Sequence, residues 1–191
     1  MSQRGYSLVE ATVAMGVILV MAAVAAPSFR ARFADAHILG AGQQFRSSFR
    51  LAWSIAIRTG VYTGIRFERL EDGRVFYSVY SDGNSNGVRS VDIASGEDRR
   101  IAGPYPLSGG APSVRVGINP GVPNLAPESG ELSGDPVRFG RSDILSFSPL
   151  GTATPGTFYL AGDSAQAAVR VNGGTARVRL MLWRGGRWKE R

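Results

Sequence analysis

The chain has 191 residues with 22 Lys and Arg against 15 Asp and Glu, a net charge of +7, no cysteine and a single histidine, His37. The lack of cysteine excludes disulfides, thiol nucleophiles and zinc–thiolate or iron–sulfur sites. With one histidine and no nucleophile or phosphate-binding motif, the sequence offers no nucleophile–base pair, so we expect a protein that is not an enzyme. The 25 glycines and 10 prolines predict a β-rich body with many turns.

The first part of the chain is a short polar leader, residues 1–5, followed by a mostly apolar run over 6–26. About 20 apolar residues are enough to cross a bilayer as a helix. Glu10 interrupts this run, and a carboxylate at the bilayer centre costs on the order of 2.5–3.5 kcal/mol. A secretory signal cut after residues 23–25 (Ala-Val-Ala) or a simple uncleaved anchor explains the apolar run, but neither explains Glu10.

The stretch Gly-Tyr-Ser-Leu-Val-Glu over 5–10 resembles the prepilin-peptidase motif of type IV pilins and type II secretion pseudopilins. The resemblance implies cleavage between Gly5 and Tyr6, N-methylation of Tyr6 and retention of the apolar helix 6–26. It places Glu10 at mature position five and Pro27 where the family often has a helix-kinking proline. In that family the acid meets the amino-terminal ammonium of a neighbouring subunit, and a buried charge pair is favourable only when both members are present. The alternative is that Glu10 merely reaches the lipid head groups.

Residues 27–60 predict an amphipathic helix that continues the apolar one. Apolar side chains recur at helical spacing with arginines between them, and we interpret the aromatic stripe as core packing. Gly40 and Gly42 weaken the middle of this helix and predict a kink or flexible joint there. Gly60 is the expected stop, because glycine favours the left-handed conformation that ends helices.

Residues 61–191 predict a globular β-rich head. Alternating runs over 61–67 and 75–80 indicate two strands joined near Asp72 and Gly73, and further strand signals lie at 144–147, 157–160, 168–171 and 177–183. The region 81–140 is rich in turn residues, with a brief apolar run at 114–118. The fold class is therefore α+β: a long amino-terminal helical spine packed against an antiparallel, β-sandwich-like head.

The segments 49–60 and 146–160 resemble the H-type pseudopilin and FimT-like minor pilin group, although Ala176 stands where that group usually has glycine. The resemblance implies the pilin fold and a single-pass protein of the bacterial inner membrane with a periplasmic head, which later joins a periplasmic or extracellular filament. It implies as partners other pilins or pseudopilins, prepilin peptidase and an inner-membrane assembly platform. The expected role is to initiate or cap a type II secretion pseudopilus or a type IV pilus. Outside the family, the alternative is a signal-anchored periplasmic β-domain.

Two further patterns suggest ligands. The first, Asp-Gly-Asn-Ser-Asn-Gly over 82–87, matches the first half of a calcium-binding loop. Calcium is the single cofactor that the sequence suggests, and a plain turn rich in Asn and Gly is the alternative interpretation. The candidate calcium ligands are Asp82, Asn84, Asn86, Val88 and Asp92.

The second pattern is the basic carboxy-terminal segment 177–191, which has six basic residues and one acid and so carries five of the seven net positive charges. Basic side chains beside aromatic ones can hold phosphates and stack on bases. The segment resembles the basic motif of FimT-like pilins, which implies DNA binding during DNA uptake. The alternative is an amphipathic strand whose arginines face solvent. The candidate DNA-binding residues are Arg184, Arg187, Trp188, Lys189 and Arg191.

Overall fold

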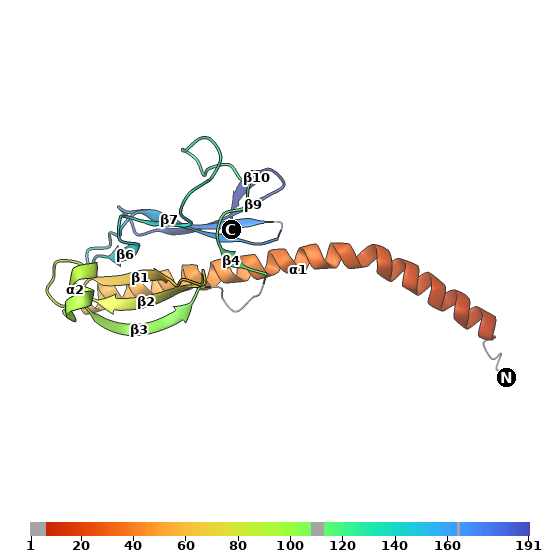
Figure 1. Cartoon of the computed structure of the whole chain (residues 1–191), viewed down its shortest axis with the longest axis horizontal. Helices are drawn as coiled ribbons and strands as arrows, with labels where there is room; N and C mark the ends of the chain where they lie inside the picture. The colour runs from red at the N-terminus through yellow and green to blue at the C-terminus, as the bar shows by residue number, and fades with distance from the viewer. Residues whose placement is uncertain (1–6, 108–112, 164) are drawn as a thin grey trace.

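The computed structural model describes residues 7–107, 113–163 and 165–191, without the side chains of 25–35. In that part of the chain one long helix, α1, packs against both antiparallel sheets of the head and extends well beyond the head (Figure 1). This α+β arrangement agrees with the predicted fold class.

Helix α1 spans Leu8–Thr59 and has well-defined ends. The Oγ of Ser7 accepts a hydrogen bond from the backbone N–H of Glu10 at 3.2 Å, which satisfies one of the free donors at the helix start. At the other end Gly60 adopts φ 70°, and its N–H donates to the carbonyl of Ala56 at 3.0 Å. The predicted stop at Gly60 is therefore confirmed.

The amino-terminal part of α1 lies outside the head and bends away from the axis of the head-bound part (Figure 1). Pro27 is the one proline in the sequence of α1, and it lacks the N–H that would bond to the carbonyl four residues earlier. Large apolar side chains of this part are exposed, for example Leu8 at 84% and Leu19 at 69%. Within the described residues, no helix contains a stretch apolar and long enough to cross a membrane.

The predicted weak point at Gly40 and Gly42 does not break the helix, because α1 continues without interruption through both. A side chain at Gly42 would bring a Cβ within 2.6 Å of Leu180 Cδ1, whereas nothing lies within 4 Å of a Cβ at Gly40. Gly42 therefore allows α1 to approach the sheet closely.

The head contains two antiparallel sheets and one short helix, α2 (Ser90–Ser95). The first sheet has the order β3-β2-β1-β6, with β1 Thr63–Arg69, β2 Val75–Ser81, β3 Arg99–Pro106 and β6 Ile144–Phe147. The second has the order β10-β9-β8-β7-β4, with β4 Arg115–Val116, β7 Gly156–Ala161, β8 Gln166–Val171, β9 Val178–Arg184 and β10 Arg187–Glu190. Strand β5, Val137–Phe139, also pairs with β7.

The predicted strands are confirmed, including the hairpin, in which Thr63 pairs with Ser81 and Arg69 with Val75. The sequence pattern did not predict β3, β5, β10 or α2, and around β4 it gave only the brief apolar run 114–118.

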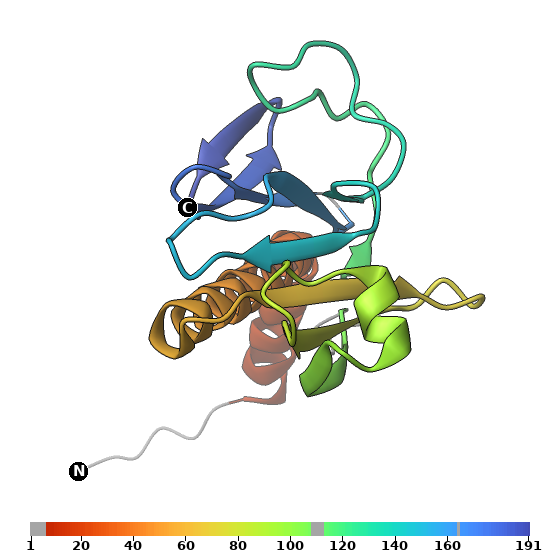
Figure 2. The same cartoon turned by 90° about the vertical axis from the view of Figure 1, so that its left-hand side faces the viewer.

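The core forms where α1 lies against both sheets (Figure 2). Phe45 and Phe49 of α1 are fully buried. The ring centroid of Phe45 is 5.1 Å from that of Phe158 on β7, and that of Phe49 is 6.2 Å from that of Phe67 on β1. The aromatic stripe is thus core packing, as predicted, and it joins the helix to both sheets.

A second, smaller core lies on the other face of the second sheet. Three side chains of the loop before β5, Val122, Leu125 and Leu132, are buried with Tyr159 and Ala168, and the two tryptophans of the carboxy-terminal hairpin pack against them.

Candidate functional sites

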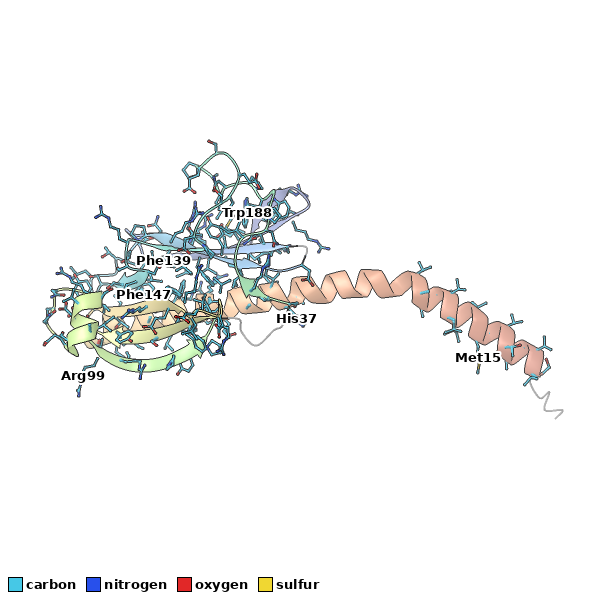
Figure 3. The ribbon with its side chains drawn as sticks, viewed as in Figure 1. Met15, His37, Arg99, Phe139, Phe147 and Trp188 are labelled. Carbon is cyan, nitrogen blue, oxygen red and sulfur yellow. The ribbon has the colours of Figure 1, made fainter. Side chains whose placement is uncertain are left out.

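The first candidate site is the free amino-terminal part of α1. Gly5 and Tyr6, the predicted cleavage and methylation residues, lie outside the described residues. Glu10 lies in the first turn of α1, is exposed, and has no ion-pair partner within the described part of the chain. An acid in this position is favoured by the helix dipole. Met15, one turn further on, likewise lies far from the head (Figure 3).

The second candidate site is the loop after β2, where calcium was expected. Asp82 is buried, and its carboxylate accepts hydrogen bonds from the backbone N–H groups of Asn84, Ser85 and Gly87 at 2.8–3.0 Å. The Oδ1 of Asn84 similarly accepts from the N–H of Asn86 at 3.2 Å. These contacts are those of a self-capped turn, the alternative interpretation of the sequence.

Two further predicted calcium ligands, Val88 and Asp92, lie in other surroundings. Val88 packs in a small apolar cluster with Tyr80 and Ile144, while one carboxylate oxygen of Asp92 is buried with no hydrogen-bond partner in the described part of the chain. Nowhere among the described residues do three Asp, Glu or His side chains gather as a metal site.

Asp98, a residue outside the predicted ligand set, also holds the loop in place. The buried carboxylate of Asp98 accepts from the N–H of Gly83 at 3.1 Å and from that of Arg89 at 2.9 Å. The contact with Gly83 spans fifteen residues, so no local spacing indicates it.

The third candidate site is the basic carboxy-terminal segment, which forms the β9–β10 hairpin. Arg187 pairs with Arg184 next to the turn, and Trp188 pairs with Trp183. Arg187, Lys189 and Arg191 are exposed, as DNA binding would require. Trp188, however, is half-buried, and its Nε1 donates to the carbonyl of Pro123 at 2.9 Å. Trp188 therefore anchors the loop before β5, which covers the outer face of the second sheet and is here called the covering loop. Figure 3 shows Trp188 on the side of the head away from α1.

The open end of the same hairpin holds a cluster of charged side chains. Glu190 forms ion pairs with Arg179 and, at 3.7 Å, with Arg177. The hydrogen bond from Arg179 is the main cause that lowers the pKa of Glu190, and the positive charges of Arg179, Arg177 and Arg46 act in the same direction. A shallow pocket of about 210 Å³ adjoins this cluster where the hairpin meets α1.

A long helix with an acid in its first turn, followed by an antiparallel two-sheet head, is consistent with the class of pilin-like proteins. A model of the family described as type II transport protein GspH matches residues 41–175. The chain belongs to this family, the H-type pseudopilins of type II secretion. No curated protein and no solved structure matches the chain significantly.

The family assignment confirms the predicted resemblance and gives the general function. The protein is a minor pseudopilin of type II secretion, a structural subunit that associates with other pseudopilins in a filament. Proteins of this family are anchored in the inner membrane.

Proposed function

We propose that the chain initiates or caps a type II secretion pseudopilus after prepilin peptidase cuts between Gly5 and Tyr6 and Tyr6 is N-methylated. The observation that carries this proposal is the amino-terminal part of α1, which projects from the head with exposed apolar side chains and Glu10 in its first turn. A monomer leaves this surface without protein partners. Packing against the helices of other subunits covers it.

Glu10 adds a specific charge interaction to this packing. In the core of a filament the carboxylate needs a positive partner, because an unpaired buried charge is strongly destabilising. We propose that the partner is the amino-terminal ammonium of the adjacent subunit, which exists only after cleavage at Gly5. Cleavage and assembly are then coupled: in an uncut chain the leader 1–5 still precedes Tyr6, so that chain has no ammonium at Tyr6 to pair with the Glu10 of a neighbouring subunit.

We also propose that 6–26 is inserted in the inner membrane, with the head in the periplasm and the assembly platform on the membrane side, before the subunit enters the filament. The sequence of this segment supports the proposal: apart from Glu10 it contains no charged residue. Fractionation and protease access to the head in intact spheroplasts test this topology.

Glu10→Gln tests the assembly role, because it keeps size and removes the charge. We expect it to reduce strongly the amount of the chain recovered with sheared filaments. Glu71→Gln makes the same chemical change on an exposed turn of the head and should leave recovery unchanged. Equal recovery of both variants would contradict the role of Glu10. Recovery with type IV pili instead would reassign the machine.

DNA capture by the carboxy-terminal hairpin is the second candidate function, supported by the exposed Arg187 and Lys189. If it holds, the full chain in nonionic detergent binds an oligonucleotide at low salt, and changing both residues to alanine weakens binding. Arg58→Ala/Arg100→Ala removes the same charge elsewhere and is the control. No binding by the unchanged chain at low salt removes this candidate.

Calcium binding by the loop 82–92 remains a proposal of lower rank, because backbone N–H groups already occupy the carboxylate of Asp82. If the loop is a self-capped turn, millimolar calcium leaves the melting temperature unchanged. Asp82→Ala should lower stability by about 1–3 kcal/mol with or without calcium, because it leaves backbone donors unpaired. A calcium-dependent rise in melting temperature that Asp82→Ala abolishes would restore the calcium site.

A further inference from the structure

The pocket between α1 and the open end of the β9–β10 hairpin combines cationic and aromatic side chains. Arg46, Arg50 and Trp53 follow one another at positions i, i+4 and i+7 of α1 and so share one side of the helix. Arg177 and Glu190 complete the charged wall. We propose that this pocket binds a carboxylate side chain of an acidic segment on a neighbouring filament subunit; the partner's identity rests on the proposed function.

The charges of the pocket are unbalanced in favour of an anion. Three guanidinium groups line it, and the carboxylates beside them are already engaged: Glu190 accepts a hydrogen bond from a fourth arginine, Arg179, and the α-carboxylate of Arg191 accepts one from Arg46. Four cationic groups therefore face two anionic ones. Within the described part of the chain no acidic side chain forms an ion pair with Arg46 or Arg50. A carboxylate brought by a partner would supply that missing charge.

The position of Arg46 prepares the pocket for such a ligand. Its Nη1 donates to an α-carboxylate oxygen of Arg191, the last residue of the sequence, at 2.8 Å, which fixes the guanidinium in place. Its Nε is buried and has no hydrogen-bond partner among the described residues. This buried Nε is out of reach of a ligand, so a carboxylate in the pocket would bind the remaining N–H groups of a guanidinium that is already held in place.

The size and place of the pocket favour an acidic side chain over a nucleic acid. Its volume of about 210 Å³ is below the roughly 300–1,000 Å³ of pockets that enclose larger ligands. Trp53, 38% exposed, offers an apolar wall to the methylene groups of Glu or Asp. Of the proposed DNA-binding residues, Arg184 and Arg187 lie at the other end of the hairpin ladder, whereas Arg191 adjoins the pocket through its bond to Arg46.

Calorimetric titration of the full chain in nonionic detergent tests the proposal, with tetraglutamate, inorganic phosphate and a twelve-nucleotide single strand as probes. We expect tetraglutamate to bind and Arg46→Gln/Arg50→Gln to weaken it about five- to thirtyfold, the effect of two ion pairs at the surface. Arg58→Gln/Arg100→Gln, with the same change in charge, should stay within about twofold, and Arg46→Lys/Arg50→Lys should recover part of the affinity.

The single variant Arg50→Gln separates a loss of binding from a loss of folding. Because Arg50 is exposed, this variant should bind tetraglutamate more weakly while its melting temperature stays unchanged. The proposal is overturned if tetraglutamate does not bind, if both double variants lose affinity equally, or if only phosphate or the oligonucleotide depends on the pocket. In cells, Arg46→Gln/Arg50→Gln should reduce recovery with filaments. If Arg46→Gln/Arg50→Gln is recovered with filaments normally while Glu10→Gln is not, this inference is refuted and the proposed function stands.

Discussion

Trp188 shows how one side chain can look like a ligand-binding residue in the sequence and serve the fold instead. An aromatic residue between Arg187 and Lys189 is typical of nucleic-acid binding. In the structure its indole N–H bonds to Pro123 and its ring packs against the small core under the covering loop. Any DNA contact by this hairpin therefore depends on its charges and not on base stacking by Trp188.

Trp188→Phe keeps most of the packing and removes the hydrogen bond to Pro123. We expect the free energy of unfolding to fall by about 0.5–1.5 kcal/mol, the usual net contribution of such a bond. Chemical denaturation of the full chain measures it. Trp53→Phe, at a half-exposed indole, is the control and should change stability by less than about 0.5 kcal/mol. Equal effects of the two changes would contradict the anchoring role.

The negative charge of Asp143 is unfavourable in the folded protein. Its backbone is left-handed, φ 51°, and its carbonyl accepts the N–H of Phe67 at 3.1 Å. Burial raises the pKa of its carboxyl group, repulsion by Asp135 adds to this, and Arg69 opposes it. Because the folded pKa is raised, the stabilising protonated form is present at low pH and is lost as pH rises through that pKa.

Asp143→Asn removes the charge and keeps a residue that accepts positive φ. At pH 7 we expect the variant to be more stable than the parent by less than about 1 kcal/mol, because the group is only partly buried. At acidic pH, once Asp143 itself has taken up a proton, the difference should fade. Thermal melts across this range measure it. A difference independent of pH would contradict the electrostatic explanation.

At the scale of elements, α1 is well predicted along its length but not in its middle. The sequence marks Gly40 and Gly42 as weak points because glycine lowers helix propensity. The structure separates them: Gly42 faces Leu180 on β9, and Gly40 faces open space. Tertiary packing thus keeps the helix continuous at a pair of residues that locally disfavour it.

The two glycines make a matched pair for mutation. Gly40→Ala should stabilise the protein by about 0.5–1 kcal/mol, because alanine favours the helix and meets no neighbour. Gly42→Ala gains the same propensity but forces its Cβ against Leu180, so it should be less stable than Gly40→Ala by about 1–3 kcal/mol. Denaturation of both variants tests this. Equal stabilisation by both would contradict close packing at Gly42.

The strands show which local patterns were informative. The β1–β2 hairpin was predictable because its apolar residues alternate around a turn at Asp72 and Gly73. Strand β3 was not, because it is an edge strand with no fully buried residue and contains Pro104. Strand β10 shares this difficulty: mostly exposed and highly charged, it resembles a tail in the sequence.

At the scale of the whole molecule, the amino-terminal part of α1 and the pocket beside the β9–β10 hairpin differ in how far apart their residues lie in the sequence. The amino-terminal site lies in one continuous stretch, in which Glu10 interrupts an apolar run and the residues 5–10 resemble the prepilin motif, so Glu10 could be proposed from the sequence. The pocket joins Arg46 and Arg50 to Arg177 and Glu190, more than a hundred residues later, through the packing of α1 on the second sheet. Such a site becomes visible only in the folded protein.

These two sites suggest one division of labour. The amino-terminal part of α1 supplies an apolar surface with a single acid, and the head supplies a cationic pocket beside the same helix. The first suits packing against other helices, and the second suits recognition of an acidic neighbour. Hydrophobic packing then provides affinity, while charge determines which subunit lies next to this one.

The account rests most directly on where the chain is cut, because the assembly role requires the apolar helix to stay in the mature protein. Mass spectrometry of the amino-terminal peptide from the protein isolated from its host membrane measures this. We predict a mature chain that begins with N-methylated Tyr6. A mature chain that begins at Ala26, or one that still begins at Met1, would contradict the account.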